Sequence, residues 1–253
     1  MSGFSKKWGL ALNVTVITLV LAAAKAAFAT AGLEFLSPST LITAFLGGVI
    51  FLMGFLLAGT LSDYKESERL PAELATSVKS LDEDFRIFLV HHEKEYGKAR
   101  RHVKELLSAI ATNFRQNVWD QHVVEQRIDA VSNFFVDVVK KNRELPATFF
   151  TKLRNEVINV ERLTRRVNVI KSTSFIEAGY AIAEILTCLI IIMFLFLRIE
   201  TVVEGVIIQA LVTFILLYMV LLIKDMDDPF ENGASFADVD LSPVFDLEKQ
   251  WTH

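Results

Sequence analysis

Four long apolar stretches alternate with polar segments along the chain. They cover residues 8–33, 40–61, 174–197 and 202–223. Each is long enough for a helix of about 20 residues to cross a hydrocarbon layer of about 30 Å. The loops 34–39 and 198–201 join these stretches in pairs, so we expect two tight antiparallel hairpins of membrane-spanning helices.

The polar segment between the two pairs, residues 62–173, contains no further membrane-length stretch. Its apolar side chains instead recur every three or four positions, which places them on one face of a helix. Examples are Leu74, Val78, Leu81 and Phe85, and Val124, Ile128, Val131 and Phe135. The predicted fold class is therefore an all-α membrane protein, with four transmembrane helices in two hairpins and a helical bundle inserted between the second and third.

This pattern divides the chain into four parts. We expect a first transmembrane hairpin at 1–61, a bundle at 62–173, a second hairpin at 174–224 and an acidic tail at 225–253. Basic residues gather at the span ends that face the bundle and the termini, whereas the hairpin loops carry only Arg198. Because positive charge near span ends favours the cytoplasmic side, both termini and the bundle are expected in the cytoplasm. The basic residues are Lys6, Lys7, Lys65, Arg69, Arg165, Arg166, Lys171 and Lys224.

Composition supports a membrane protein and excludes two other classes. With 52% hydrophobic residues and 20 Phe in 253 residues, the chain is too apolar for an ordinary soluble domain. A formal net charge of -4 argues against nucleic-acid binding, which needs a local surplus of Lys and Arg. The single cysteine, Cys188, excludes an internal disulfide framework.

Motifs for catalysis are absent from the sequence. There is no Gly-rich phosphate loop, no nucleophile elbow and no pair of histidines at metal-binding spacing on a helix. His91 and Glu95 would share one helical face, as zinc ligands sometimes do, but a charged stretch of this kind is more often a solvated surface. We therefore expect no enzyme activity, no cofactor and no metal.

Charged residues inside the apolar stretches are costly, at about 2.5–3.5 kcal/mol each near mid-membrane, and so indicate a role. Lys25 would lie roughly 25 Å along the first helix, near the outer interface. Glu204, at the start of the fourth stretch, would lie at the same level. We favour an ion pair of the two residues, or simple snorkelling at the outer surface, over the alternative that Lys25 attracts anions to an outer vestibule. Glu177 and Glu184 share a face of the third helix. They either line a hydrated cavity or, as we favour, form hydrogen bonds inside the bundle.

The second apolar stretch combines glycines with a regular apolar stripe. Leu46, Ile50, Met53 and Leu57 recur at steps of four, three and four, and Gly54 follows Met53. In a ring of several copies, this stripe would form stacked apolar rings that expel water, as a channel gate does. From this pattern alone we favour the simpler interpretation, that the stripe faces lipid or a neighbouring helix.

Two motifs at the ends of these stretches resemble the bestrophin family of anion channels. The first is SDYKESERLP at 62–71, and the second is DDPFE at 227–231, followed by FADVDL at 236–241. The residues that carry the likeness are Tyr64 and Glu66 in the first motif and Asp228, Pro229 and Phe230 in the second. The family's paired tryptophans and adjacent arginine are replaced here by Asp63 and Tyr64, and Glu231 stands where the family has glycine.

This resemblance implies a homopentamer in the lipid bilayer, with one axial pore for small inorganic anions such as chloride. Alignment on the Leu-Pro step places the apolar neck near Leu46, Ile50 and Met53 or Gly54. The bundle would surround a cytoplasmic vestibule, and the membrane would be a bacterial-type inner membrane. Animal members bind calcium through an acidic tail. Here we favour a solvated tail without a metal, because the acidic run is interrupted.

Three functional hypotheses follow. The first is a bestrophin-like ion channel, anion-selective, with an axial pore lined by the second transmembrane helix. The alternative is an oligomeric membrane scaffold whose cytoplasmic bundle binds a partner protein. A third is a membrane enzyme or sensor that uses His91, His92 or the carboxylates of the tail.

Overall fold

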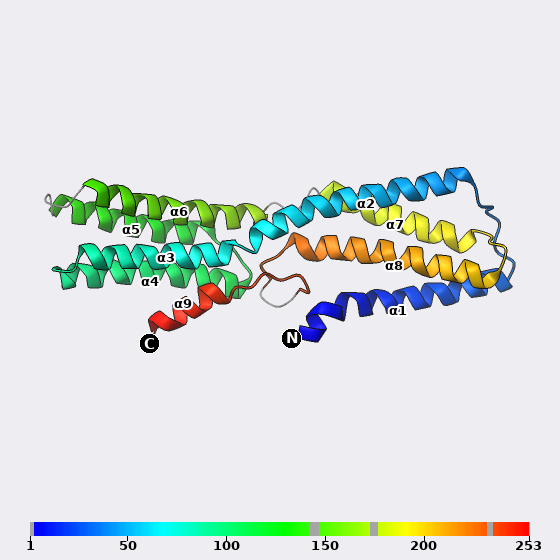
Figure 1. Cartoon of the computed structure of the whole chain (residues 1–253), viewed down its shortest axis with the longest axis horizontal. Coiled ribbons are helices and arrows are strands. Elements are labelled where there is room, and N and C mark those ends of the chain that lie inside the picture. The colour runs from blue at the N-terminus through cyan, green and yellow to red at the C-terminus, as the bar shows by residue number, and fades with distance from the viewer. Residues whose placement is uncertain (1–2, 142–146, 173–176, 232–234, 253) are drawn as a thin grey trace. The chain divides into compact units, whose positions relative to one another are not determined.

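The computed structural model describes residues 3–141, 147–172, 177–231 and 235–252. The described residues form α-helices joined by turns and loops. Their strand-like pairing is limited to one isolated bridge between Leu36 and Leu197. The described helices are shown in Figure 1. They are α1 (Gly3–Thr30), α2 (Thr40–Ser67), α3 (Leu70–Phe88), α4 (Glu93–Gln116), α5 (Gln121–Lys141), α6 (Ala147–Ser172), α7 (Glu177–Phe196), α8 (Val202–Asp227) and α9 (Ser242–Thr252).

The chain forms two compact units. The first, called here the apolar unit, contains α1, α2 up to Tyr64, α7 and α8, and the second, the polar unit, contains α3 to α6 and α9. The described residues include four helices that are long and apolar enough to cross a membrane, and these begin at Trp8, Thr40, Gly179 and Val202. The residues after α8 do not form a separate part, because they are shared between the two units.

In the apolar unit, α8 packs against both α1 and α7. The expected first hairpin is not formed as a packed pair, since the backbones of α1 and α2 do not approach each other within the described residues. The loop between them pairs with the end of α7: Leu36 N–H donates to Phe196 O at 3.0 Å, and Arg198 N–H donates to Leu36 O at 2.7 Å. The loop thus crosses the end of α7, and α1 and α2 lie at opposite edges of this unit (Figure 1).

The polar unit confirms the prediction of amphipathic helices. The stripe on α3 is enclosed, with Leu74, Val78, Leu81 and Phe85 each at most 1% exposed. Helix α3 packs against α4 and α6, and α5 packs against α4 and α6. Pro71 lies in the first turn of α3, where its missing N–H costs nothing. Asn117 ends α4 in the left-handed conformation that asparagine tolerates well.

The acidic tail is folded and not freely solvated, which corrects the expectation. In the apolar unit, the carboxylate of Asp225 accepts hydrogen bonds from the backbone N–H groups of Phe236 at 3.3 Å and Ala237 at 2.7 Å. In the polar unit, α9 packs on α3 and α4 and buries Val244 and Leu247. The tail therefore contributes to both units, because its apolar residues alternate with acidic ones.

The buried stripe of α3 can be tested with a matched pair of substitutions. Leu81→Ala removes a side chain that is 0% exposed and should lower the free energy of unfolding by about 2–5 kcal/mol. Ile87→Ala on the same helix removes a side chain that is 60% exposed and should change it by about 0.5 kcal/mol or less. Thermal unfolding of the detergent-solubilised protein measures both, and equal effects would contradict the described packing of α3.

Candidate functional site

Helix α2 has one face enclosed by its own chain. Val49, Met53 and Leu56 are at most 8% exposed and belong to a cluster with side chains of α7 and α8. The cluster partners include Ile190 and Phe194 on α7 and Leu216, Val220 and Ile223 on α8. Because the backbone of α2 stays apart from both helices, this contact is made by long side chains.

The stripe predicted to line a pore lies largely on this enclosed side. Met53 is 0% exposed, while Leu46 and Leu57 are partly buried against the same cluster. Ile50 lies at the edge of the stripe and is 40% exposed. Gly54 has open space where a Cβ would be. Within the stripe, Ile50 and Gly54 are the residues that the rest of the chain leaves uncovered. A role for the stripe in conduction stays a prediction.

The opposite face of α2 is open and combines two large rings with small residues. Phe51 is 77% exposed and Phe55 is 69% exposed, and their spacing of four residues places one above the other. Gly47 and Gly48 lie one turn before Phe51, and a Cβ at either would meet no atom within 4 Å. This face thus has protruding rings beside shallow notches, a shape suited to close packing against another helix.

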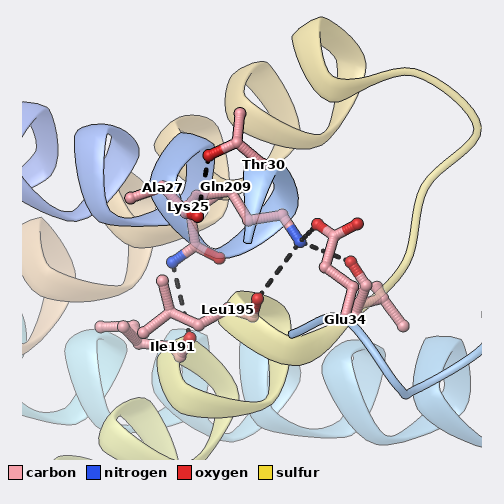
Figure 2. A network of polar contacts seen from close by, with 8 residues as sticks. Lys25, Ala27, Thr30, Glu34, Ile191, Leu195 and Gln209 are labelled. Atoms are coloured by element: carbon pink, nitrogen blue, oxygen red, sulfur yellow. Dashed lines mark hydrogen bonds and ion pairs between the residues drawn. The ribbon is translucent and has the colours of Figure 1, made fainter. Parts of the chain in front are cut away.

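Lys25 is the most buried charged residue of the apolar unit and ties three segments together (Figure 2). Its side chain is 1% exposed, and Nζ lies 2.6 Å from Oε1 of Glu34 in the loop after α1. The same Nζ donates to the backbone carbonyl oxygens of Leu197 and, at 3.4 Å, of Leu195 at the end of α7. A cation is favourable there, because the last carbonyls of a helix lack backbone donors and carry partial negative charge.

The expected pair between Lys25 and Glu204 is therefore wrong. Glu204 is exposed in the first turn of α8, where its backbone N–H donates to Oγ1 of Thr201 at 3.2 Å. The chain turns back after α1 through Gly32, whose φ of +72° suits glycine, and this turn brings Glu34 to Lys25. Lys25 is also enclosed, so it does not present an open cationic surface to anions.

Glu184 on α7 differs from the buried arrangement that the sequence favours. Glu184 is 52% exposed, and its Oε1 lies 3.8 Å from Nζ of Lys224 on α8. The side chain of Glu177 lies outside the described residues. Glu184 is thus at the surface of this chain, where an ion pair of this length contributes little to stability.

The residues that carry the family resemblance occupy structured positions. Glu66, in the last turn of α2, accepts a hydrogen bond from Nε of Arg166 on α6 at 2.6 Å. Phe230 is 0% exposed, and its ring centroid lies 5.6 Å from that of Phe114. Tyr64 is partly buried, Asp228 is partly buried and Pro229 is buried. The described contacts of these motifs join the last turn of α2 to α6 through Glu66 and pack Phe230, just after α8, against Phe114.

Metal ligands do not cluster in the part of the chain that the structure describes. No group of three or more His, Cys, Asp and Glu side chains there could hold a metal ion. The carboxylate of Asp225 is occupied by backbone N–H groups, and His91 and His92 are exposed just before α4. Cys188 is exposed and unpaired by disulfide.

Comparison with known proteins gives a match in fold. No protein-family model matches the sequence, and no curated protein does. A crystal structure of a bacterial bestrophin homolog from Klebsiella pneumoniae, phased with zinc, aligns with a TM-score of 0.74 at 12% identity over 96% of this chain and 95% of that chain. A single-residue variant of a bestrophin homolog from that organism gives a TM-score of 0.77 at 10% identity over 95% and 94%. A structure described as a membrane protein gives 0.78 at 11% identity over 95% and 96%.

These matches span nearly the whole of each chain, so the protein has the fold of the bacterial bestrophin homologs. At these identities the likeness establishes the fold alone. Together with the four long apolar helices, it identifies an integral membrane protein. The resemblance drawn from the two sequence motifs is confirmed at this level.

The Lys25 contacts generate a test of stability. Lys25→Met leaves the carboxylate of Glu34, only 14% exposed, without its cation, and should lower the free energy of unfolding by about 3–5 kcal/mol. Adding Glu34→Gln should recover part of this loss, because the uncompensated charge is removed. Lys224→Met, which removes a lysine that is 68% exposed, serves as control and should change stability by about 1 kcal/mol or less. Thermal unfolding compares the variants, and similar losses for Lys25→Met and Lys224→Met would contradict the buried pair.

Proposed function

We propose that the protein is a bestrophin-like ion channel, selective for small anions, that assembles as a homopentamer around an axial path lined by α2. The observation that carries the proposal is the open face of α2, where Phe51 and Phe55 protrude beside glycines. Four membrane-length helices are too few to enclose an ion path within one chain, so a path requires several copies. The shared fold and the resemblance to bestrophin anion channels support this assembly.

The face of α2 that reaches the axis is proposed to be the one that the chain leaves uncovered. The stripe of Leu46, Ile50, Met53 and Leu57 is partly occupied by contacts with α7 and α8. A side chain enclosed by its own subunit is not available to an axis between subunits. Contacts therefore favour Phe51 and Phe55 as the constriction, with Ile50 and Gly54 on its edge.

A ring of Phe side chains would act in two ways. A narrow apolar constriction expels water because it cannot replace water's hydrogen bonds, so small changes in width switch conduction. The edge of a phenyl ring carries partial positive charge and the face partial negative charge. Rings that turn their edges toward the axis would therefore favour anions over cations, without any basic side chain in the constriction.

The alternative function, a membrane scaffold that binds a partner protein, has one supporting observation. A groove of about 510 Å³ lies on the hairpin of α5 and α6 and is lined largely by apolar side chains, among them Phe135, Val139, Phe150 and Ile158. Such grooves accept apolar segments of partners.

For either function, we propose that both termini and the polar unit lie on the cytoplasmic side of a bacterial-type inner membrane, from the distribution of Lys and Arg.

The constriction can be tested by ion flux. Phe51→Ala combined with Phe55→Ala should widen and wet the path and raise chloride flux severalfold in liposomes that contain the reconstituted protein. Val16→Ala on α1, which shortens a side chain that is 64% exposed, is the control and should leave flux unchanged. An increase with Ile50→Ala but not with the Phe variants would place the path on the other face of α2. Unchanged flux in all assembled variants would favour the scaffold.

Assembly is tested separately by native mass spectrometry in detergent. A closed ring should appear as a single homo-oligomer, expected to be a pentamer from the family resemblance. The interface is predicted to depend on the notches of α2, so Gly47→Leu combined with Gly48→Leu should reduce the oligomer, because added side chains would hold neighbouring helices apart. A monomer at every concentration of the unmodified protein would contradict the channel.

A further inference from the structure

The interior of the apolar unit contains further buried polar side chains, which lie on the side of Lys25 away from the loop that carries Glu34. Gln209 on α8 is 1% exposed, and its Nε2 donates to Oγ1 of Thr213 at 3.0 Å and to the carbonyl oxygen of Ile191 on α7 at 3.5 Å. Figure 2 shows the amide of Gln209 directed toward Ile191. Thr213 is 0% exposed. Polar groups thus extend from the end of α7 into the membrane-spanning part.

Two further threonines lie near this level. Gly205 is the neighbour of Lys25, since a Cβ there would come within 3.2 Å of Cε of Lys25. Thr18 is seven residues before Lys25 on α1, which corresponds to about 10 Å along the helix, and Thr213 is eight residues after Gly205 on antiparallel α8. On α7, Thr187 precedes Ile191 by one turn. Three helices therefore bring buried threonines to a similar depth, with Thr18 6% and Thr187 2% exposed.

Three oxygen atoms in this group have no hydrogen-bond partner among the described protein atoms: Oγ1 of Thr18, Oγ1 of Thr187 and Oε1 of Gln209. The orientation of the Gln209 amide follows from chemistry, because the carbonyl of Ile191 can only accept a hydrogen bond and so must face Nε2. Each unsatisfied buried polar group costs about 1–3 kcal/mol. Because three such groups lie in one membrane-spanning unit, a bound ligand that forms hydrogen bonds with them would stabilise the protein.

We propose that ordered water molecules occupy the interior of each apolar unit at this level and bond to Thr18, Thr187 and Gln209. Water fits the donor and acceptor pattern, because Oε1 of Gln209 only accepts, whereas the hydroxyl groups donate and accept. An anion would be repelled by Oε1, and no carboxylate among these side chains would compensate the charge of a bound cation. One neighbour of each threonine is small: Ala22 is the next buried residue after Thr18 on α1, and Ala183 is the buried residue one turn before Thr187 on α7.

The water site is closed on both sides. On the side of the proposed water site away from Lys25, the buried residues Ala183, Leu216 and Val220 have apolar side chains that form no hydrogen bonds. Toward the near end, Lys25 is held by Glu34 and by the end of α7. The water is thus internal to one chain and separate from any path between chains, so the inference stands apart from the proposed channel.

Isosteric substitutions give opposite results for a dry and a hydrated site. If the hydroxyl groups are dry and unsatisfied, Thr187→Val and Thr18→Val each remove a buried polar group and should raise Tm. If they bind water, each variant loses hydrogen bonds and should lower Tm by about 2–4 °C. Thr15→Val is the control on α1, since Thr15 is exposed and bonds to the carbonyl of Ala11 at 2.7 Å within its own helix. It should shift Tm by less than either buried variant.

The deciding measurement is a cryo-electron microscopy map of the full assembled protein at a resolution that shows ordered water. The unmodified protein should show density within hydrogen-bonding distance of Gln209 Oε1 and at least one threonine hydroxyl. The density near α7 should be lost in Thr187→Val. Absence of density in the unmodified protein would overturn the inference whatever the Tm values, and so would a rise of Tm in both buried variants.

Discussion

The carbonyl groups at the end of α7 determine how the membrane-length helices are arranged. The last carbonyl groups of a helix have no donors within the helix, so where they are buried the rest of the protein must supply donors. Lys25 on α1 donates to the carbonyls of Leu195 and Leu197, and the backbone N–H of Leu36 donates to that of Phe196. These bonds tie α1 and the following loop to the end of α7, and the loop crosses that end.

The path of the loop across the end of α7 also explains why α2 lies apart from α1. Once the loop has crossed α7, α2 runs along the far side of the α7 and α8 pair and touches it only through long side chains such as Met53. Its other face is left to partners outside the chain. The faces of α1, α7 and α8 that remain uncovered are rich in Val, Ile and Leu, as is usual beside lipid. The open face of α2 differs by combining Phe51 and Phe55 with glycines.

The polar unit could be predicted from the sequence because water makes its helices amphipathic. Leu74, Val78 and Leu81 are buried where their spacing indicates. The spacing of apolar residues does not identify the buried face of α2. This helix is apolar on all sides, because a helix in lipid does not require a polar face. Ile50 and Phe51 are adjacent and equally apolar, so spacing alone could not tell which one its own chain covers. Contacts made by residues far along the chain, on α7 and α8, decide this point.

Helical rise predicts the depth of Lys25 in the membrane, but it does not identify the partner of this residue. Glu204 was chosen because it lies at the same level, whereas the turn at Gly32 brings Glu34 back to Lys25 from the loop. Similarly, the tail looked solvated because of its charge, yet Asp225 is engaged by the backbone of residues eleven and twelve positions later. In both cases a carboxylate is satisfied by a turn of the chain.

Burial also separates two roles for polar groups in a membrane protein. Lys25 has a full set of partners, so it acts as a structural connection and is unavailable to a passing ion. Thr18, Thr187 and Gln209 are also buried, but one oxygen of each has no hydrogen-bond partner among the described protein atoms, which is why we propose a small ligand there. In the proposed channel the ion would therefore pass outside this interior, along a surface that the chain does not cover. The open face of α2 is such a surface, and it carries apolar rings and no fixed charge at Phe51 and Phe55.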